Sequence, residues 1–241
     1  MSERRSITLN GREIAFELRR SDRRTIGFSV GRDGLAVTAP RRVAEREIGR
    51  ALASKAGWIL SRLEAWENRP ARRELRLETG ERLPWLGGEL ELRLLGEGVR
   101  TTVRRESERL LVRHDPALAG ELHTRTLTAA LQRYYRREGE ALMAPKVEGF
   151  AARLGRPVKK VIVREQKRRW GSCAPDGTIR LNWRLMGFPE DLIDYVCAHE
   201  AAHLVEHNHS PAYWRVVAGL MPDWKARRQR MREEAERWVA F

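Results

Sequence analysis

The chain has 241 residues, of which 41% are hydrophobic and 33% charged, so it can bury a sizeable core as one large domain or two small ones. No apolar run approaches the ~20 residues of a membrane span. The N-terminus has no hydrophobic signal segment, so we expect a cytoplasmic protein with no membrane partner. Two cysteines exclude a disulfide framework.

The formal charge of +14 comes mostly from arginines spread along the whole chain rather than gathered in a tail. Such a charge is compatible with nucleic-acid association. It is also typical of solvated faces on which arginine pairs with glutamate at helical spacing, and we favour this second interpretation. Nothing in the sequence indicates the oligomeric state.

The first half of the chain predicts short antiparallel strands. Residues 6–18 alternate in polarity around Asn10-Gly11, a two-residue hairpin signal. Further strands are expected over residues 25–30, 35–38 and, in about four pieces, 74–112. We detect no internal sequence repeat.

One helix is predicted between these groups of strands, over about residues 41–67, because apolar residues recur there at helical spacing. Its Trp58 and Trp66 are expected to lie in the core. A linker is predicted at residues 69–73. We therefore expect a β-rich N-terminal region with one helix over residues 1–116.

The second half of the chain predicts mainly helices. Residues 118–154 form a long helical pattern that Pro145 should kink or divide. Two strands are expected over residues 158–162 and 178–183. The next helix opens near residues 188–191, and a cluster of histidines follows.

The histidines on this helix are candidate metal ligands. His199, Glu200 and His203 form the pattern H-E-x-x-H, and positions four apart lie on one face of a helix. Two imidazoles placed in this way can bind one ion, and Glu200 can point at a water on that ion. The run before the motif is apolar, so the helix is expected to be buried, and a metal would give its buried histidines a partner.

A third protein ligand is needed, since a catalytic zinc site has three protein ligands and leaves the fourth position to water. If the helix continued, His207 would lie roughly 12 Å from His199 along the axis, too far for one ion. Asn208 can end the helix and bring His209 back from a new direction. The resulting spacing is that of H-E-x-x-H-x-x-G-x-x-H, with Glu206 at the glycine. We expect His209 to complete a site for one Zn2+, with His207 as the alternative.

Five segments of the second half closely resemble the YgjP-like metallopeptidase domain, a family related to the SprT-like zinc proteases. They are Arg169–Cys173, Gly177–Asn182, Asp194–Val196, His199–Leu204 and Asn208–Trp214. The resemblance covers nearly the whole chain and implies a zincin-type hydrolase in which His199, His203 and His209 hold the metal. It also implies that Glu200 is the general base.

The expected fold is α+β, with an antiparallel β-rich region over residues 1–116. A zincin-like helical metallohydrolase domain with a small sheet would follow over residues 117–241, and one continuous YgjP-like unit is the alternative. In zincins a strand beside the metal helix takes up an extended peptide as a further strand, and we expect this edge near residues 170–173. The candidates for an oxyanion donor are Tyr213, His207 and Arg168.

The leading hypothesis is zinc-dependent hydrolysis of a peptide or protein by metal-activated water, with Glu200 as general base. The alternative substrate is a nucleotide phosphoanhydride or another small anion, because basic residues precede the site. These residues are Lys159, Lys160, Arg164, Lys167, Arg168 and Arg169. A third hypothesis is a closed, structural zinc site with His207 as the fourth protein ligand.

Overall fold

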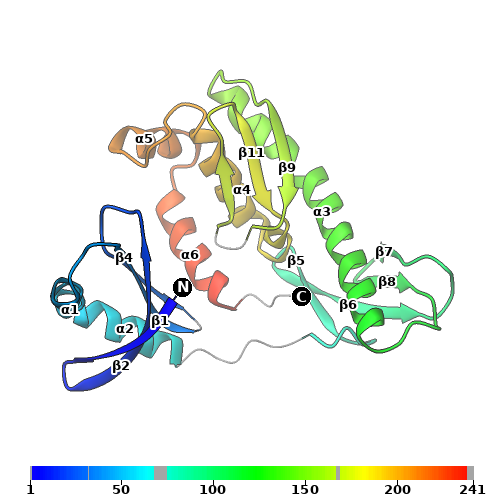
Figure 1. Ribbon diagram of the computed structural model, residues 1–241. Coiled ribbons are helices and arrows are strands. Elements are labelled where there is room, and N and C mark those ends of the chain that lie inside the picture. Colours follow the sequence, from blue (N-terminus) through cyan, green and yellow to red (C-terminus); the bar gives the residue numbers. More distant parts are fainter. Residues whose placement is uncertain (1, 32, 68–74, 167–168, 238–241) are drawn as a thin grey trace. The chain divides into compact units, whose positions relative to one another are not determined.

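The computed structural model of the protein describes residues 2–31, 33–67, 75–166 and 169–237. Helices and strands both contribute to it, which confirms the α+β class (Figure 1). The chain divides into two compact units, an N-terminal unit (Met1–Ala71) and a C-terminal unit (Arg72–Phe241). The predicted linker at residues 69–73 lies outside the described residues.

The N-terminal unit is a four-stranded sheet with two helices packed on it. Its elements are β1 (Ser2–Leu9), β2 (Arg12–Ser21), β3 (Gly27–Gly31), β4 (Gly34–Pro40), α1 (Glu45–Ser54) and α2 (Ala56–Glu67). The strand order is β1-β2-β4-β3, with antiparallel outer pairs and a parallel central pair. The predicted hairpin is confirmed, because φ is 49° at Asn10 and 81° at Gly11, the left-handed pair that a two-residue turn requires.

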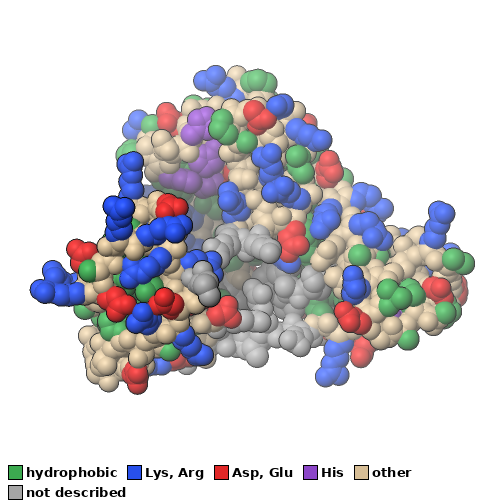
Figure 2. Space-filling view, viewed as in Figure 1, with side chains coloured by type: hydrophobic (Ala, Val, Ile, Leu, Met, Phe, Trp, Pro, Cys, Tyr) green, Lys and Arg blue, Asp and Glu red, His purple; other side chains and the backbone are tan. Residues whose placement is uncertain are grey.

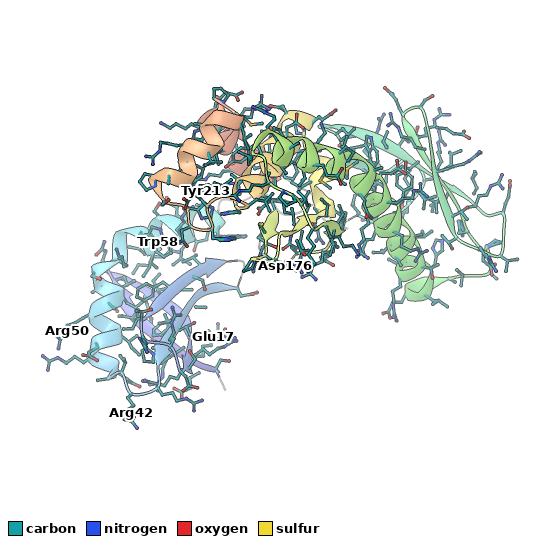
Figure 3. All side chains as sticks on the ribbon, turned by 90° about the horizontal axis from the view of Figure 1, so that it is seen from above. Glu17, Arg42, Arg50, Trp58, Asp176 and Tyr213 are labelled. Atoms are coloured by element: carbon teal, nitrogen blue, oxygen red, sulfur yellow. The ribbon has the colours of Figure 1, made fainter. Side chains whose placement is uncertain are left out.

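The predicted single helix is in two parts, since α1 ends at Ser54 and α2 begins at Ala56. Apolar residues of both helices are buried in one core with the sheet: Ile48, Leu52, Ala56, Ile59 and Leu63. Trp58, however, is 45% exposed on α2, so the expectation that it is a core residue is wrong (Figure 3). Trp66 is partly buried.

The C-terminal unit begins with a second four-stranded sheet. Its strands are β5 (Arg82–Trp85), β6 (Gly88–Leu95), β7 (Thr102–Glu106) and β8 (Arg109–Arg113), so about four strands are present as predicted for residues 74–112, but not all of them pair antiparallel. Their order is β5-β6-β8-β7, again with antiparallel outer pairs and a parallel central pair. The second sheet therefore has the strand order and directions of the first.

The two sheets also share their register. Phe16 pairs with Leu35 across β2 and β4, and Leu92 pairs with Leu110 at the corresponding place across β6 and β8. The first turn of each sheet has two successive left-handed residues, namely Asn10-Gly11 and Leu86-Gly87. The same four-stranded arrangement thus occurs twice in the chain, although its sequence shows no repeat.

The second sheet packs with the helix that follows it, α3 (Gly120–Arg153). Leu83, Leu92 and Leu110 share one buried cluster with Leu131 and Tyr135 of α3. The boundary between the compact units therefore precedes these strands, whereas the sequence patterns grouped them with the N-terminal region.

α3 runs for 34 residues with Pro145 inside it, so this proline does not divide the helix as expected. Its packing against the following strand and the histidine-bearing helix supports it along its length. Lys146, one residue further on, lies 2.7 Å from carboxylate oxygens of both Glu190 and Asp194. This pair of contacts ties α3 to the helix that carries the histidines.

The remaining elements surround that helix, α4. They are β9 (Lys160–Arg164), β10 (Gly171–Cys173), β11 (Thr178–Asn182), the 3-10 helix η1 (Trp183–Gly187), α4 (Glu190–Ala202), α5 (Pro211–Leu220) and α6 (Trp224–Arg237). The strand order is β10-β11-β9, so β10 is an edge strand. α4 is mostly buried among α3, α5, α6, β10 and β11 (Figure 1). Within the described ranges, no helix combines the length and apolarity that crossing a bilayer requires.

Candidate metal centre

α4 carries the H-E-x-x-H motif at its C-terminal end. Glu190 and Asp191 occupy its first turn, where the helix dipole favours negative charge. The helix ends at Ala202 with His203 as its C-cap. The backbone N–H groups that follow bond to carbonyls three residues earlier, as in a tightened last turn. The expectation that Asn208 ends the helix is therefore wrong, because the turn closes directly after His203.

Three imidazoles converge beyond this turn. One ring nitrogen from each of His199, His203 and His209 lies within 4.8 Å of the other two. The Nε2 atoms of His199 and His209 are 3.1 Å apart. Ligand atoms about 2.1 Å from a tetrahedral zinc are about 3.4 Å from one another, so this arrangement fits a single ion. Figure 2 shows histidine side chains gathered at one place on the surface.

The structure thus brings together all three predicted ligands. The alternative ligand, His207, is exposed and does not belong to this cluster. The hypothesis of a closed site with four protein ligands required His207, so the geometry does not favour it.

A hydrogen bond determines which nitrogen of the His203 ring faces the centre. Nδ1 of His203 lies 3.0 Å from the backbone oxygen of Glu206. Because a carbonyl only accepts, Nδ1 carries the proton and Nε2 keeps a free lone pair. The backbone of Glu206 makes this contact, so the pattern tolerates a glutamate where related proteases have glycine. In His199, Nδ1 is buried without a hydrogen-bond partner in the described part of the chain.

Burial keeps two of the imidazoles neutral. Desolvation, followed by the charges of His203 and His209, lowers the pKa of His199 to about 3. Desolvation also lowers the pKa of His203. Neutral imidazole is the form that binds a metal ion, so protons compete only weakly for these two side chains near neutral pH.

Tyr213 lies in the first turn of α5 (Figure 3). Its ring contacts the rings of all three histidines. Ser210 caps this helix, and its hydroxyl accepts a hydrogen bond from the backbone N–H of Tyr213 at 3.3 Å. The Tyr213 ring is fully buried and stacks on His203 with centroids 4.5 Å apart. Its hydroxyl donates to the backbone oxygen of His199 at 2.9 Å.

The Tyr213 hydroxyl is therefore already engaged in joining α5 to α4. This makes Tyr213 a positioning residue and argues against its predicted role as oxyanion donor. Of the other two candidates, His207 is exposed outside the cluster, and Arg168 lies outside the described residues.

Glu200 is the buried acid beside the histidines, with 5% of its surface exposed. Burial raises its pKa to about 8, and the positive charge of Arg169 opposes this shift. The carboxyl group packs against Gly171 on β10, where an added Cβ would stand 2.5 Å from Oε1 of Glu200. A carboxyl whose pKa lies near neutrality is suited to accept and release a proton.

The nearby Ser172 and Cys173 are not activated nucleophiles. Burial, followed by the charge of Glu200, raises the pKa of Cys173 to about 11, so its thiol stays protonated. The Ser172 hydroxyl donates to Oε1 of Gln166 at 3.5 Å rather than to an imidazole. The chemistry of the centre therefore depends on the histidines and Glu200.

Two contacts of the centre were not predicted. The motif R-W-G-S-C was recognised, but only the fold shows that its Gly171 makes room for Glu200. The second contact is made by Arg228 on α6, whose Cζ lies 4.8 Å from the ring centroid of Trp214. The Trp214 ring is in turn 5.7 Å from that of His209. Neither contact has a local sequence signal, because the partners are far apart along the chain.

Three imidazoles that converge on one point, with a buried carboxyl group beside them, are the arrangement typical of metal-dependent hydrolases. The family model described as YgjP-like, metallopeptidase domain matches residues 24–234. This match spans most of the chain, which therefore belongs to the YgjP-like metallopeptidase family.

One solved structure similar to this chain is the metallopeptidase zymogen of Pyrococcus abyssi, abylysin. It is 25% identical, with a TM-score of 0.37, and the match covers 41% of this chain and 99% of that one. Comparison with curated proteins finds no match.

Proposed function

We propose that the protein is a zinc-dependent peptidase in which His199, His203 and His209 hold the ion. Glu200 is its general base. The observation that carries the proposal is the approach of three ring nitrogens to within 4.8 Å of one another, at the C-terminal end of the helix that buries Glu200. Zinc is favoured among divalent ions because neutral imidazoles are ligands that it prefers.

The bound ion would supply polarisation of the scissile carbonyl and activation of a water. Glu200 accepts a proton from the attacking water and passes it to the leaving amine. Its burial favours the protonated state of the carboxyl between these two transfers. Tyr213 and the backbone of Glu206 hold the His203 ring in place, so that its Nε2 keeps facing the centre.

An extended peptide is the substrate that best suits the neighbouring sheet. Among the described strands, β10 pairs with β11 on one side only, which leaves its other edge available for a peptide. Gly171 of β10 lies against Glu200, so a peptide added along this strand would pass the general base. This supports the expected edge at residues 170–173.

A nucleotide substrate has less support from the basic residues before the site. Lys159 pairs with Asp176 at 2.8 Å, which satisfies its charge locally. Lys160 and Arg164 are exposed on β9, the strand at the opposite edge of the sheet from β10. Lys167 and Arg168 lie outside the described residues.

Elemental analysis of purified, zinc-dialysed protein tests the metal site. Wild type and His207→Ala should each retain about one zinc per chain, and His209→Ala should retain much less. Full zinc retention by His209→Ala would show that His209 is not a ligand.

Hydrolysis of unfolded casein by the zinc-loaded protein tests the reaction. Glu200→Gln should keep its zinc and lose turnover by on the order of 100-fold or more, because an amide cannot accept the proton. Undiminished casein hydrolysis by this variant would remove Glu200 from the role of base.

A further inference from the structure

Arg228 is a half-buried cation that has no anionic partner among the described residues. It lies on α6 with its guanidinium stacked on Trp214, and it forms no ion pair or hydrogen bond with any described residue. Its neighbours on the same helix differ. Arg227 bonds the carboxylate of Asp223 at 2.8 Å, and Arg230 bonds that of Asp191 at 2.5 Å. The donors of Arg228 are therefore free to bind a group from outside the chain.

Trp214 connects this guanidinium to the proposed zinc site. Its ring centroid lies 5.7 Å from that of His209 and 6.0 Å from that of His199. Arg228 thus lies beside the histidines, on the side formed by α5 and α6.

Contact with the Trp214 ring restricts the motion of the Arg228 guanidinium. Trp214 is itself stacked on Trp224, with centroids 4.2 Å apart and planes 14° apart. A guanidinium held over such a ring loses little freedom on binding, and its fork of N–H donors can bind an anion. A planar edge of parallel donors matches the two oxygens of a carboxylate.

The positive charge expected at the zinc-loaded centre also favours an anionic ligand. Three neutral imidazoles and a divalent cation would leave the centre positively charged beside Arg228. The nearby carboxyl, Glu200, is buried on the side of β10 and forms no ion pair with Arg228. Building on the proposed function, we propose that Arg228 binds a carboxylate of the peptide substrate next to the scissile bond. This carboxylate is either the C-terminus of the peptide or an acidic side chain.

The test is calorimetric binding of three probes to the zinc-loaded, full-length protein. All three are zinc-chelating hydroxamic acids coupled to one amino acid. The first carries glutamine with a free C-terminal carboxylate, the second glutamate with a C-terminal amide, and the third glutamine with a C-terminal amide. The neutral third probe measures chelation alone, and the first two identify which carboxylate is preferred.

We expect one of the carboxylate probes to bind the wild type about tenfold more tightly than the neutral probe. Arg228→Gln should abolish this preference and leave the binding of the neutral probe unchanged. Lys225→Gln is the matched control, because Lys225 lies on the same helix over Trp224, with Nζ 5.8 Å from the ring. It removes the same charge and should keep the preference.

Two results would overturn the proposal in distinguishable ways. If the neutral probe binds but no carboxylate improves binding, or if the preference survives in Arg228→Gln, Arg228 has no such role and the metal centre stands. If none of the probes binds the zinc-loaded protein, the proposed function fails and this inference fails with it.

Discussion

The carboxyl group of Glu200 lies directly against the backbone of Gly171, in a space that any larger residue would occupy. The three heavy atoms nearest to a Cβ added at Gly171 all belong to Glu200, at 2.5–2.7 Å. Real Cβ atoms do not approach other atoms so closely, so a side chain at this position must displace the acid. Gly171 therefore positions the proposed general base.

We predict that Gly171→Ala lowers casein hydrolysis by on the order of 100-fold, because a displacement of about 1 Å at a catalytic group can have this effect. Zinc content should stay at the wild-type level, since the nearest atoms include none from the histidines. Gly149→Ala is the control, because a Cβ there meets nothing within 4 Å. Equal activities of the two variants would show that the contact has no function.

Tyr213 makes a second testable contact, its hydroxyl bond to the backbone oxygen of His199. Tyr213→Phe leaves that buried oxygen without this donor and should lower the free energy of unfolding by about 1–2 kcal/mol. It should also weaken zinc binding, because the turn that carries His203 is then less well held. Tyr134→Phe is the control, since the Tyr134 ring is buried but its hydroxyl forms no hydrogen bond within the described residues. Denaturant titration and competition with a zinc chelator measure the two effects, and equal losses in both variants would contradict the prediction.

The convergence of the three proposed metal ligands was predictable because their signal is local. The spacing of His199 and His203 on one helical face needs no knowledge of the rest of the fold. His209 was chosen for a reason that was only partly correct. A turn after the helix was required, but it begins at His203 and not at Asn208.

The contacts that sequence could not predict join residues far apart along the chain. Gly171 meets Glu200 only because β10 lies beside α4. The repeat of the four-stranded sheet could not be detected in the sequence for a related reason. Its two copies share backbone register and the burial of positions such as Ile14 and Leu90, and many apolar residues satisfy such a position equally well.

Because the second sheet belongs to the C-terminal unit, we can predict which C-terminal fragments of the chain fold. A fragment of residues 72–241 keeps the sheet whose Leu92 and Leu110 share a cluster with Leu131 and Tyr135 of α3. We expect it to unfold cooperatively and to bind zinc. The shorter fragment 117–241 lacks these strands and exposes that apolar surface, so it should aggregate or unfold at a lower temperature. If the shorter fragment is as stable as the longer one, the domain boundary lies near residue 116.

The raised pKa of Glu200 predicts how the stability of the metal-free protein depends on pH. Its carboxyl has a pKa of about 8 in the folded protein, against a usual value of 4.5. Between these values the folded protein holds a proton that the unfolded chain has released. The resulting stabilisation is therefore complete below pH 4.5 and is lost as the pH rises through about 8.

Glu200→Gln lacks this group, so the comparison isolates it from every other titration in the protein. From pH 5 to pH 9 the metal-free wild type should lose several kcal/mol of unfolding free energy relative to the variant, at about 1.4 kcal/mol per pKa unit. Urea titrations of both proteins in the presence of a chelator measure the difference. If the two curves stay parallel over this range, Glu200 is not held protonated by burial, and the physical argument for its proton transfer loses its basis.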